Sequence, residues 1–361
     1  MSPTNSIIAD LSSPIVRELP TPASLRTGER GKRVRVAQFG MGPIGVETIR
    51  LLAERSWCEV VGAVDIDPLK IGKRITDLSG VEFENNPTIF GSFDELMDEA
   101  APDVVLHTAG SKILPTFAQI EPMVAAGVSV VSSCEELLYP WHRAPQRSEE
   151  IDALCKTTGA GVVGTGVNPG FVLDVLPITL TGVSRRVDSI YGERVVNAST
   201  RRMPLQKKIG SGMDPDEFRA LFAAGKAGHA GFQESARLVC HAMGWDEAEV
   251  IETCEPVIAS HDITTQFLSV KEGLTCGIHQ RVEAMYRGRL VLELDLKMYL
   301  DAPNPHDMVR IVGDPPIEVE AKGGIAGDHA TVAALVNAVP RIRQARAGLL
   351  LMTDLAVPCW A

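Results

Sequence analysis

The 361-residue chain lacks three features that would each indicate a particular class of protein. It has no apolar run near the roughly 20 residues that a membrane-spanning helix needs. It has no excess of basic residues, since the formal net charge is −11, which argues against nucleic acid or an anionic membrane as a partner. Its seven cysteines are scattered and form no CxxC pair, a pattern typical of reduced thiols in a cytoplasm.

Two further patterns are missing. Residues 1–32 have no basic stretch followed by an apolar core, so we expect no signal peptide there. Their proline and serine content predicts a flexible arm that is able to pack on a neighbour. The histidines show no metal-ligand spacing such as HExxH, so we expect no metal.

From Arg33 to about Asp174, apolar runs typical of strands alternate with helical patterns. The runs read VRVAQFG, EVVGAVD, DVVLHTAG, VSVVSS and GVVGTGV. Residues 111–126 have apolar side chains at helical spacing, and Gly127 follows as a helix stop. Strand–helix–strand units of this kind predict a parallel sheet covered by helices.

The pattern changes after Asp174. The runs SIYGERVVNAST, HQRVEAMYRGR and LVLELDLKMYL predict antiparallel strands, with a helical piece from about Pro215 to Met243. Residues 328–345 form an amphipathic helix that we expect to pack on the first domain. The predicted fold is α/β, a Rossmann-type doubly wound parallel sheet with a second α+β domain built on a mostly antiparallel sheet. The predicted units are an arm at 1–32, a first domain at 33–175, a substrate and dimerisation domain at 176–324, and a returning C-terminal helix at 325–361.

A GxGxxG segment follows the first apolar run and opens a helix. In a dinucleotide site, the first glycine makes a tight turn, the second lets the backbone approach a pyrophosphate, and the third lets helix and strand pack closely. A glycine-rich turn without a ligand is the alternative, and the combination of strand, helix start and a later acid makes it the less favoured one. The loop residues expected to bind the cofactor are Gly40, Gly42, Pro43, Ile44 and Gly45.

Cofactor preference depends on Asp65, which ends the second apolar run, where a carboxylate can bind the ribose hydroxyls. Its charge favours NAD, because it would repel a 2′-phosphate. Lys70, Lys73 and Arg74 follow closely and could bind that phosphate instead, or form an ordinary solvated face. We therefore predict NAD or NADP.

Three later strand ends should face the nicotinamide half of the cofactor, because ligands of doubly wound sheets lie across the carboxyl ends of the strands. They read HTAGS, SSCEELLYPW and GTGVNPGF. Asn168 could hydrogen-bond the carboxamide or the substrate, or act only as a turn residue. The further residues expected at the cofactor are Thr108, Ala109, Gly110 and Asn168.

The paired acids of the second strand end suggest a catalytic group. A partly buried carboxylate beside the nicotinamide can move protons while hydride is transferred. The alternative is that the acids cap a helix. We predict that Glu135 is the acid/base and Glu136 is structural, although a shift of one residue in the strand end would exchange these roles.

The substrate wall is predicted from residues near these strand ends, although all of them could instead pack the domain interface. His229 and Gln233 could close the site from the second domain, although a lone histidine in a glycine-rich turn before a helix could equally be a cap or a surface residue. Four basic residues could bind a carboxylate but fit a solvated strand edge better: Arg201, Arg202, Lys207 and Lys208. The residues expected in the substrate pocket are Tyr139, Trp141, Thr165, Phe171 and His229.

The motifs GMGPIG, SSCEELLYPW, GTGVNPGFVLD, QKKIGSG, GHAGFQES and GGIAGDHATVAALVN occur in one order between about Val34 and Pro358. Together they resemble the 2,4-diaminopentanoate dehydrogenases and the related native amine dehydrogenases, whose N-terminal domain is of the dihydrodipicolinate reductase type. The His-His…Lys and PSGTA-type motifs of the reductases themselves are missing here, as is the EKP segment of the glucose–fructose oxidoreductase-like enzymes.

The resemblance implies NAD(P)-dependent interconversion of an amine with a ketone or aldehyde plus ammonia. It also implies that a single glutamate of the CEEL segment is the catalytic acid/base. Two alternatives are an alcohol- or semialdehyde-type oxidoreductase on the same fold and a dinucleotide sensor without catalysis. We expect a cytoplasmic homodimer that takes a small carbonyl or amine substrate and ammonia.

Overall fold

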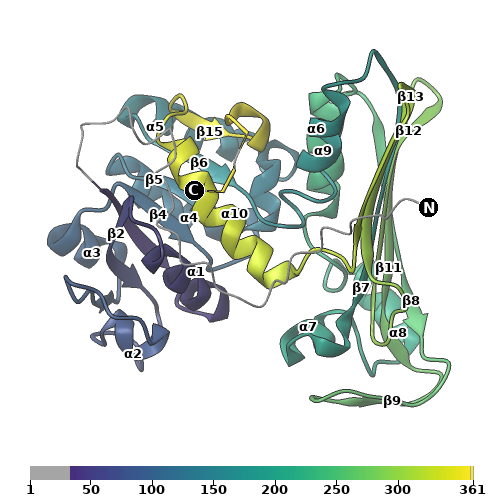
Figure 1. Ribbon diagram of the computed structural model, residues 1–361, viewed down its shortest axis with the longest axis horizontal. Helices are drawn as coiled ribbons and strands as arrows, with labels where there is room; N and C mark the ends of the chain where they lie inside the picture. Colours follow the sequence, from purple (N-terminus) through teal and green to yellow (C-terminus); the bar gives the residue numbers. More distant parts are fainter. Residues whose placement is uncertain (1–32, 358, 361) are drawn as a thin grey trace, which may run out of the picture.

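The computed structural model describes residues 33–357, 359 and 360, so the predicted arm at 1–32 lies outside the described residues. The first of its two large sheets has seven strands, all parallel, in the order β15-β6-β5-β4-β1-β2-β3 (Figure 1). They are β1 (Val34–Phe39), β2 (Cys58–Val64), β3 (Ile89–Phe90), β4 (Val104–His107), β5 (Ser129–Ser132), β6 (Gly161–Gly164) and β15 (Gly348–Leu350).

Helices cover both faces of this sheet. Strands such as β4 and β5 have side chains on both faces, and all of their residues are buried. Apolar side chains of α1 (Pro43–Ala53) and α10 (Gly327–Ile342) form one core. Those of α3 (Phe93–Ala100), α4 (Ile113–Ala125) and α5 (Pro145–Thr158) form the other. A short α2 (Ile75–Ser79) begins beside the segment that leads into β3, where the Ile75 N–H donates to the Pro87 carbonyl oxygen at 2.9 Å.

The second sheet has six strands in the order β14-β13-β7-β12-β11-β8. Its neighbours pair antiparallel except β12 with β7, and one face packs on helices around a separate apolar core. The strands are β7 (Arg186–Asn197), β8 (Glu249–Ile258), β11 (Thr275–Tyr286), β12 (Arg289–Tyr299), β13 (His306–Asp314) and β14 (Ile317–Lys322), with a small hairpin of β9 (Ile263–Thr264) and β10 (Ser269–Val270). The helices are α6 (Val175–Thr181), α7 (Met203–Lys208), α8 (Pro215–Ala223) and α9 (Phe232–Ala242).

The predicted fold class is confirmed: a doubly wound parallel sheet is joined to a mostly antiparallel sheet. The single helical piece expected from Pro215 to Met243 is corrected to two helices, α8 and α9. Gly225, Gly228 and Gly231 interrupt it with backbone φ angles of +68°, +93° and +82°, which favour glycine and end an α-helix. Strands β3 and β15 of the first sheet and β8, β13 and β14 of the second were not predicted, nor was the hairpin of β9 and β10.

The last helix, α10, connects the two sheets. It leaves the second sheet after β14 and lies on the first, where Leu335, Val336 and Val339 share a core with Ile49 and Leu52 of α1 (Figure 1). The chain then adds β15 beside β6. The second sheet is therefore an insertion between two parts of the first unit. In the described part of the chain, none of the helices has the length and apolar character needed to cross a bilayer.

Candidate functional site at the domain junction

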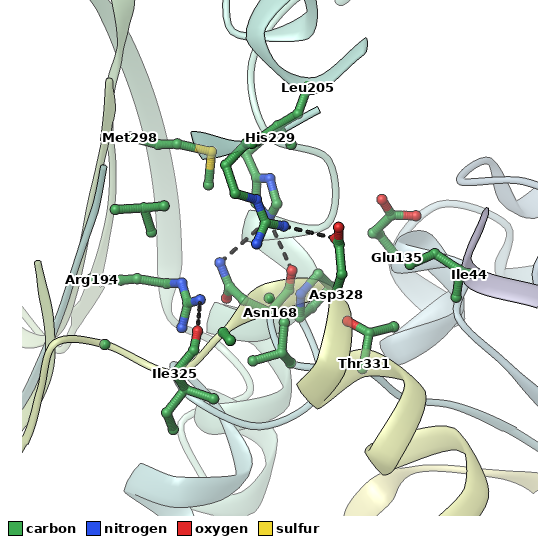
Figure 2. A pocket seen from close by; sticks show the side chains of 18 of the residues that line it. Ile44, Glu135, Asn168, Arg194, Leu205, His229, Met298, Ile325, Asp328 and Thr331 are labelled. Carbon is green, nitrogen blue, oxygen red and sulfur yellow. Dashed lines mark hydrogen bonds and ion pairs between the residues drawn. The ribbon is translucent and has the colours of Figure 1, made fainter. Parts of the chain in front are cut away.

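A cavity of about 830 Å³ lies between the carboxyl ends of the parallel strands and the second sheet. Figure 2 shows Glu135 and Ile44 on one side of it and Arg194 and Met298 on the other. Of the residues predicted at the site, those that line the cavity are Ile44, Thr108, Ala109, Gly110, Glu135, Asn168 and His229.

The glycine loop has the geometry that a phosphate site needs. Gly40 has a φ of +92°, and a Cβ there would lie 3.1 Å from the Thr108 carbonyl oxygen. A Cβ on Gly45 would lie 1.9 Å from the Gly40 carbonyl oxygen, so only glycine fits between strand and helix. A Cβ on Gly42 would meet no described atom within 4 Å. Pro43 then begins α1, whose N-terminus has no side-chain cap.

Asp65 lies directly after β2 and is bound to the loop. Its Oδ2 accepts hydrogen bonds from the Met41 N–H at 2.7 Å and from the Lys70 Nζ at 3.0 Å, and its Oδ1 accepts one from the Asp67 N–H. Burial alone would raise the pKa of this carboxyl, but the bonds from Asp67, Lys70 and Met41 together hold the pKa below its usual range. Lys70 is therefore engaged by Asp65. Lys73 and Arg74 do not line the cavity.

The loop after β4 is hydrogen-bonded to the glycine loop. Thr108 Oγ1 donates to the Gly40 carbonyl oxygen at 3.0 Å and accepts from Gln38 Nε2 at 2.8 Å. Ala109 and Gly110, which follow, are exposed on the cavity wall. Their small size leaves space beside the glycine loop for a flat ring.

The two adjacent glutamates have different surroundings. Both lie in the 3₁₀ turn η2 (Glu135–Leu138), which Ser133 and Cys134 connect to β5. Glu136 is buried, and its carboxylate accepts hydrogen bonds at 2.8 Å from the Lys112 Nζ and from the Ile113 N–H at the start of α4. Glu135 faces the cavity, and its ion pair in the described residues is with Lys208, at 3.8 Å. Glu136 thus caps a helix that precedes it in the chain, whereas the Glu135 carboxylate remains accessible.

His229 lies against Asn168 in the lining of the cavity (Figure 2). Its Nε2 donates to the Asn168 carbonyl oxygen at 2.9 Å, which places the ring proton on that nitrogen. Burial, reinforced by the positive charge of Lys208, lowers the pKa of His229 to about 4, so the ring is neutral at pH 7. Within the described residues, the side-chain oxygen of Asn168 is buried without a hydrogen-bond partner.

The second domain contributes cations that the sequence interpretation assigned to a solvated edge. Arg201 Nη2 donates to Asp328 Oδ1 at 2.7 Å, and Arg202 Nε donates to Asp328 Oδ2 at 3.3 Å. Lys208 points toward Glu135. All of these side chains line the cavity.

Arg194, which was not predicted, also lines the cavity. It is buried and paired with Asp307 at 2.9 and 3.0 Å, and it donates to the Ile325 carbonyl oxygen at 2.8 Å. Asp307 in turn accepts a hydrogen bond from the Ile325 N–H at 2.7 Å. The buried ion pair therefore holds the segment that leads into α10 at both its N–H and its carbonyl group.

The predicted substrate wall is corrected at four positions, none of which lines this cavity. Tyr139 and Trp141 line a separate cavity beside β15, because η2 turns the chain away and Tyr139 packs on His241. Thr165 is buried beneath the surface, and Phe171 is exposed outside the cavity. Gln233 bonds His142 instead of reaching the site.

Comparison with known proteins identifies the family. Residues 171–360 match the family described as the 2,4-diaminopentanoate dehydrogenase C-terminal domain. The chain belongs to the 2,4-diaminopentanoate dehydrogenase family. It is 31% identical over 333 residues to the 2,4-diaminopentanoate dehydrogenase of Acetoanaerobium sticklandii, which covers 91% of this chain and 94% of that protein. The resemblance noted from the motifs is thereby confirmed, and family membership makes the protein an oxidoreductase.

Two further relatives extend the comparison. An amine dehydrogenase of Streptomyces virginiae is 26% identical over 336 residues, 86% of this chain and 93% of that protein. The structure of an amine dehydrogenase from Mycobacterium smegmatis superimposes with a TM-score of 0.81 at 21% identity, over 92% of this chain and 98% of that chain. This second likeness shows a shared fold.

The site residues fit a nicotinamide dinucleotide on two observations. The space in front of Gly42 is open, and the N-terminus of α1 is uncapped by side chains in the described residues. Among the described residues, no group of three or more His, Cys, Asp or Glu side chains could hold a metal ion.

Proposed function

We propose that this protein is an NAD(P)-dependent amine dehydrogenase that reversibly aminates a small ketone or aldehyde with ammonia, with Glu135 as the acid/base. The observation that carries the proposal is the contrast between the two glutamates. Glu136 is occupied by the N-terminus of α4, whereas Glu135 presents a carboxylate to the cavity. The family and its amine dehydrogenase relatives support the same activity.

The cofactor would be held by the glycine loop and the strand ends. Backbone N–H groups at the start of α1 suit the phosphates, and Asp65 suits the adenosine ribose. Thr108, Ala109, Gly110 and Asn168 would border the nicotinamide. When bound, the nicotinamide supplies hydride for amination or accepts it in the reverse direction.

The chemistry assigned to Glu135 is proton transfer at the substrate. Its carboxylate can bind ammonium, take up a proton so that ammonia attacks the carbonyl, and return a proton to the departing hydroxyl. Its negative charge also stabilises the substrate iminium cation. Arg201 and Lys208 of the second domain, which line the cavity, would suit a substrate that carries an anionic group.

The cofactor preference is proposed to favour NAD. Asp65 is ionised at neutral pH and sits where a 2′-phosphate would come, and Lys70 is already paired with it. A cytoplasmic homodimer remains the prediction for the working state, which size-exclusion chromatography and cell fractionation would test.

The test is the oxidation of reduced cofactor in the presence of a ketone and aldehyde panel, with and without ammonium. Oxidation that depends on ammonium supports the amine dehydrogenase. Turnover without ammonium would identify an alcohol- or semialdehyde-type oxidoreductase, and cofactor binding without turnover on any substrate would identify a sensor.

A further inference from the structure

A second hollow of about 560 Å³, here called the loop hollow, lies beside the glycine loop and is lined by Gly42 and Pro43. Three residues line both spaces and so mark their junction: Ile44, Arg202 and Asp328. Arg202 belongs to the second domain, directly before α7, yet it faces the same hollow as Gly42 and Pro43 at the start of α1.

The cations of the loop hollow differ in how firmly they are held. Arg50 donates to the Ser79 carbonyl oxygen at 2.8 Å and pairs with Glu47. Lys70 pairs with Asp65 at 3.0 Å. Arg202 has a side chain that is 47% exposed, and within the described residues its guanidinium makes one hydrogen bond, from Nε to Asp328 at 3.3 Å. An arginine has five N–H donors, so most of its binding capacity is unused.

Asp328 does not need Arg202 to balance its charge. Arg201 donates to its other oxygen at the shorter distance of 2.7 Å, and the carboxylate lies in the first turn of α10, where the helix dipole favours an anion. Arg202 can therefore leave Asp328 without stranding a buried charge. Of the three cations, it is the one that an incoming anion can recruit.

A dinucleotide brings such an anion to this place. The N-terminus of α1 offsets only about half an elementary charge of a doubly charged pyrophosphate. A guanidinium binds phosphate oxygens through paired N–H donors, which suits the remaining charge.

We propose that Arg202 binds the cofactor pyrophosphate from the second domain, opposite the N-terminus of α1, and so ties the two domains together when cofactor is bound. This rests on the proposed use of NAD(P). Asp328 holds the guanidinium beside the loop until the phosphate takes its place.

The test measures dissociation constants of NADH and NADPH by nicotinamide fluorescence, without turnover, for the wild type, Arg202→Ala and Asp328→Asn. We expect Arg202→Ala to weaken both cofactors by a similar factor, about tenfold or more. Asp328→Asn removes the competing carboxylate and should leave affinity unchanged or increase it. Lys207→Ala is the matched control, because it removes one positive charge from α7, the helix that follows Arg202, at an exposed position outside both cavities. It should change neither constant by more than about twofold.

Each contrary result has a separate meaning. Loss of NADPH affinity alone would assign Arg202 to the 2′-phosphate and overturn the pyrophosphate contact. Equal losses in Arg202→Ala and Asp328→Asn would show that the ion pair acts only on structure, and normal binding by Arg202→Ala would remove the residue from the cofactor site. A wild type that binds neither cofactor would instead overturn the proposed function. Circular dichroism and thermal unfolding of each variant establish that it is folded.

Discussion

Replacing each of the adjacent glutamates by glutamine should separate catalysis from stability. Glutamine preserves the size of the side chain but cannot transfer a proton. At Glu135, the ion pair that is lost joins partly exposed side chains 3.8 Å apart, which contributes at most about 1 kcal/mol. Glu135→Gln should therefore keep its unfolding temperature within about 2 °C of the wild type. Its rate should fall by about 10²–10⁴-fold.

Glu136→Gln should show the opposite effect. The buried carboxylate accepts two hydrogen bonds of 2.8 Å, and glutamine keeps one acceptor while turning an N–H₂ group toward the other donor. Losing one charge-assisted bond costs roughly 1.5–3 kcal/mol. The share due to Lys112 is small, because its side chain is 63% exposed and screened by water. A loss of about 2 kcal/mol lowers the unfolding temperature by a few degrees.

Scanning fluorimetry and initial rates of ammonium-dependent oxidation of NADH measure both effects, and cofactor affinity should change little in either variant. If Glu136→Gln loses the rate while Glu135→Gln retains it, the assignment of the two acids is reversed. If neither variant loses rate, proton transfer does not occur at this turn.

Three further predictions concern the loop, the cofactor and pH. Gly42→Ala should leave the unfolding temperature unchanged but weaken cofactor binding about tenfold or more, because its Cβ meets only the space for the phosphates. Gly45→Ala should also destabilise the fold, because its Cβ would collide with the Gly40 carbonyl oxygen. Fluorescence titration and thermal unfolding distinguish the two variants. Asp65→Ala should weaken NADH more than NADPH in the same titration, and equal losses would exclude a ribose contact. Burial lowers the pKa of His107 to about 4 from 6.5, so the unfolded chain binds the proton first and stability falls as the pH drops from 6.5 to 4, by roughly 3 kcal/mol at most. The unfolding free energy of His107→Gln should therefore fall less over this range, and parallel curves would contradict the assignment.

The parts of the fold that could be predicted are those with a local signal. Five parallel strands lie in mostly apolar runs, because most of their side chains are buried beneath the helices on either face. Strands β3 and β15 have two and three residues, too few for any periodicity to appear, and only pairing with a neighbour defines them. The break between α8 and α9 could have been anticipated from the glycines of that segment.

The site residues also differ in whether a local sequence motif indicates their position. The glycine loop and Glu135 belong to short motifs that follow predicted strands, so their positions could be derived from the sequence. Arg194 and Arg202 could not be placed, because their partners lie 113 and 126 residues further along the chain. Tyr139 and Trp141 were misplaced because a 3₁₀ turn separates them from the strand end and changes the direction of the chain.

The insertion of the second sheet has a consequence for synthesis and expression of the protein. Strands β1 to β6 leave the ribosome long before α10 and β15, which complete the same sheet and one of its cores. A fragment that stops before α10 would expose the apolar side chains of α1 and an unpaired edge at β6, both of which promote aggregation. A separate nucleotide-binding unit would instead require residues 327–351 to be joined by a short linker behind residue 175.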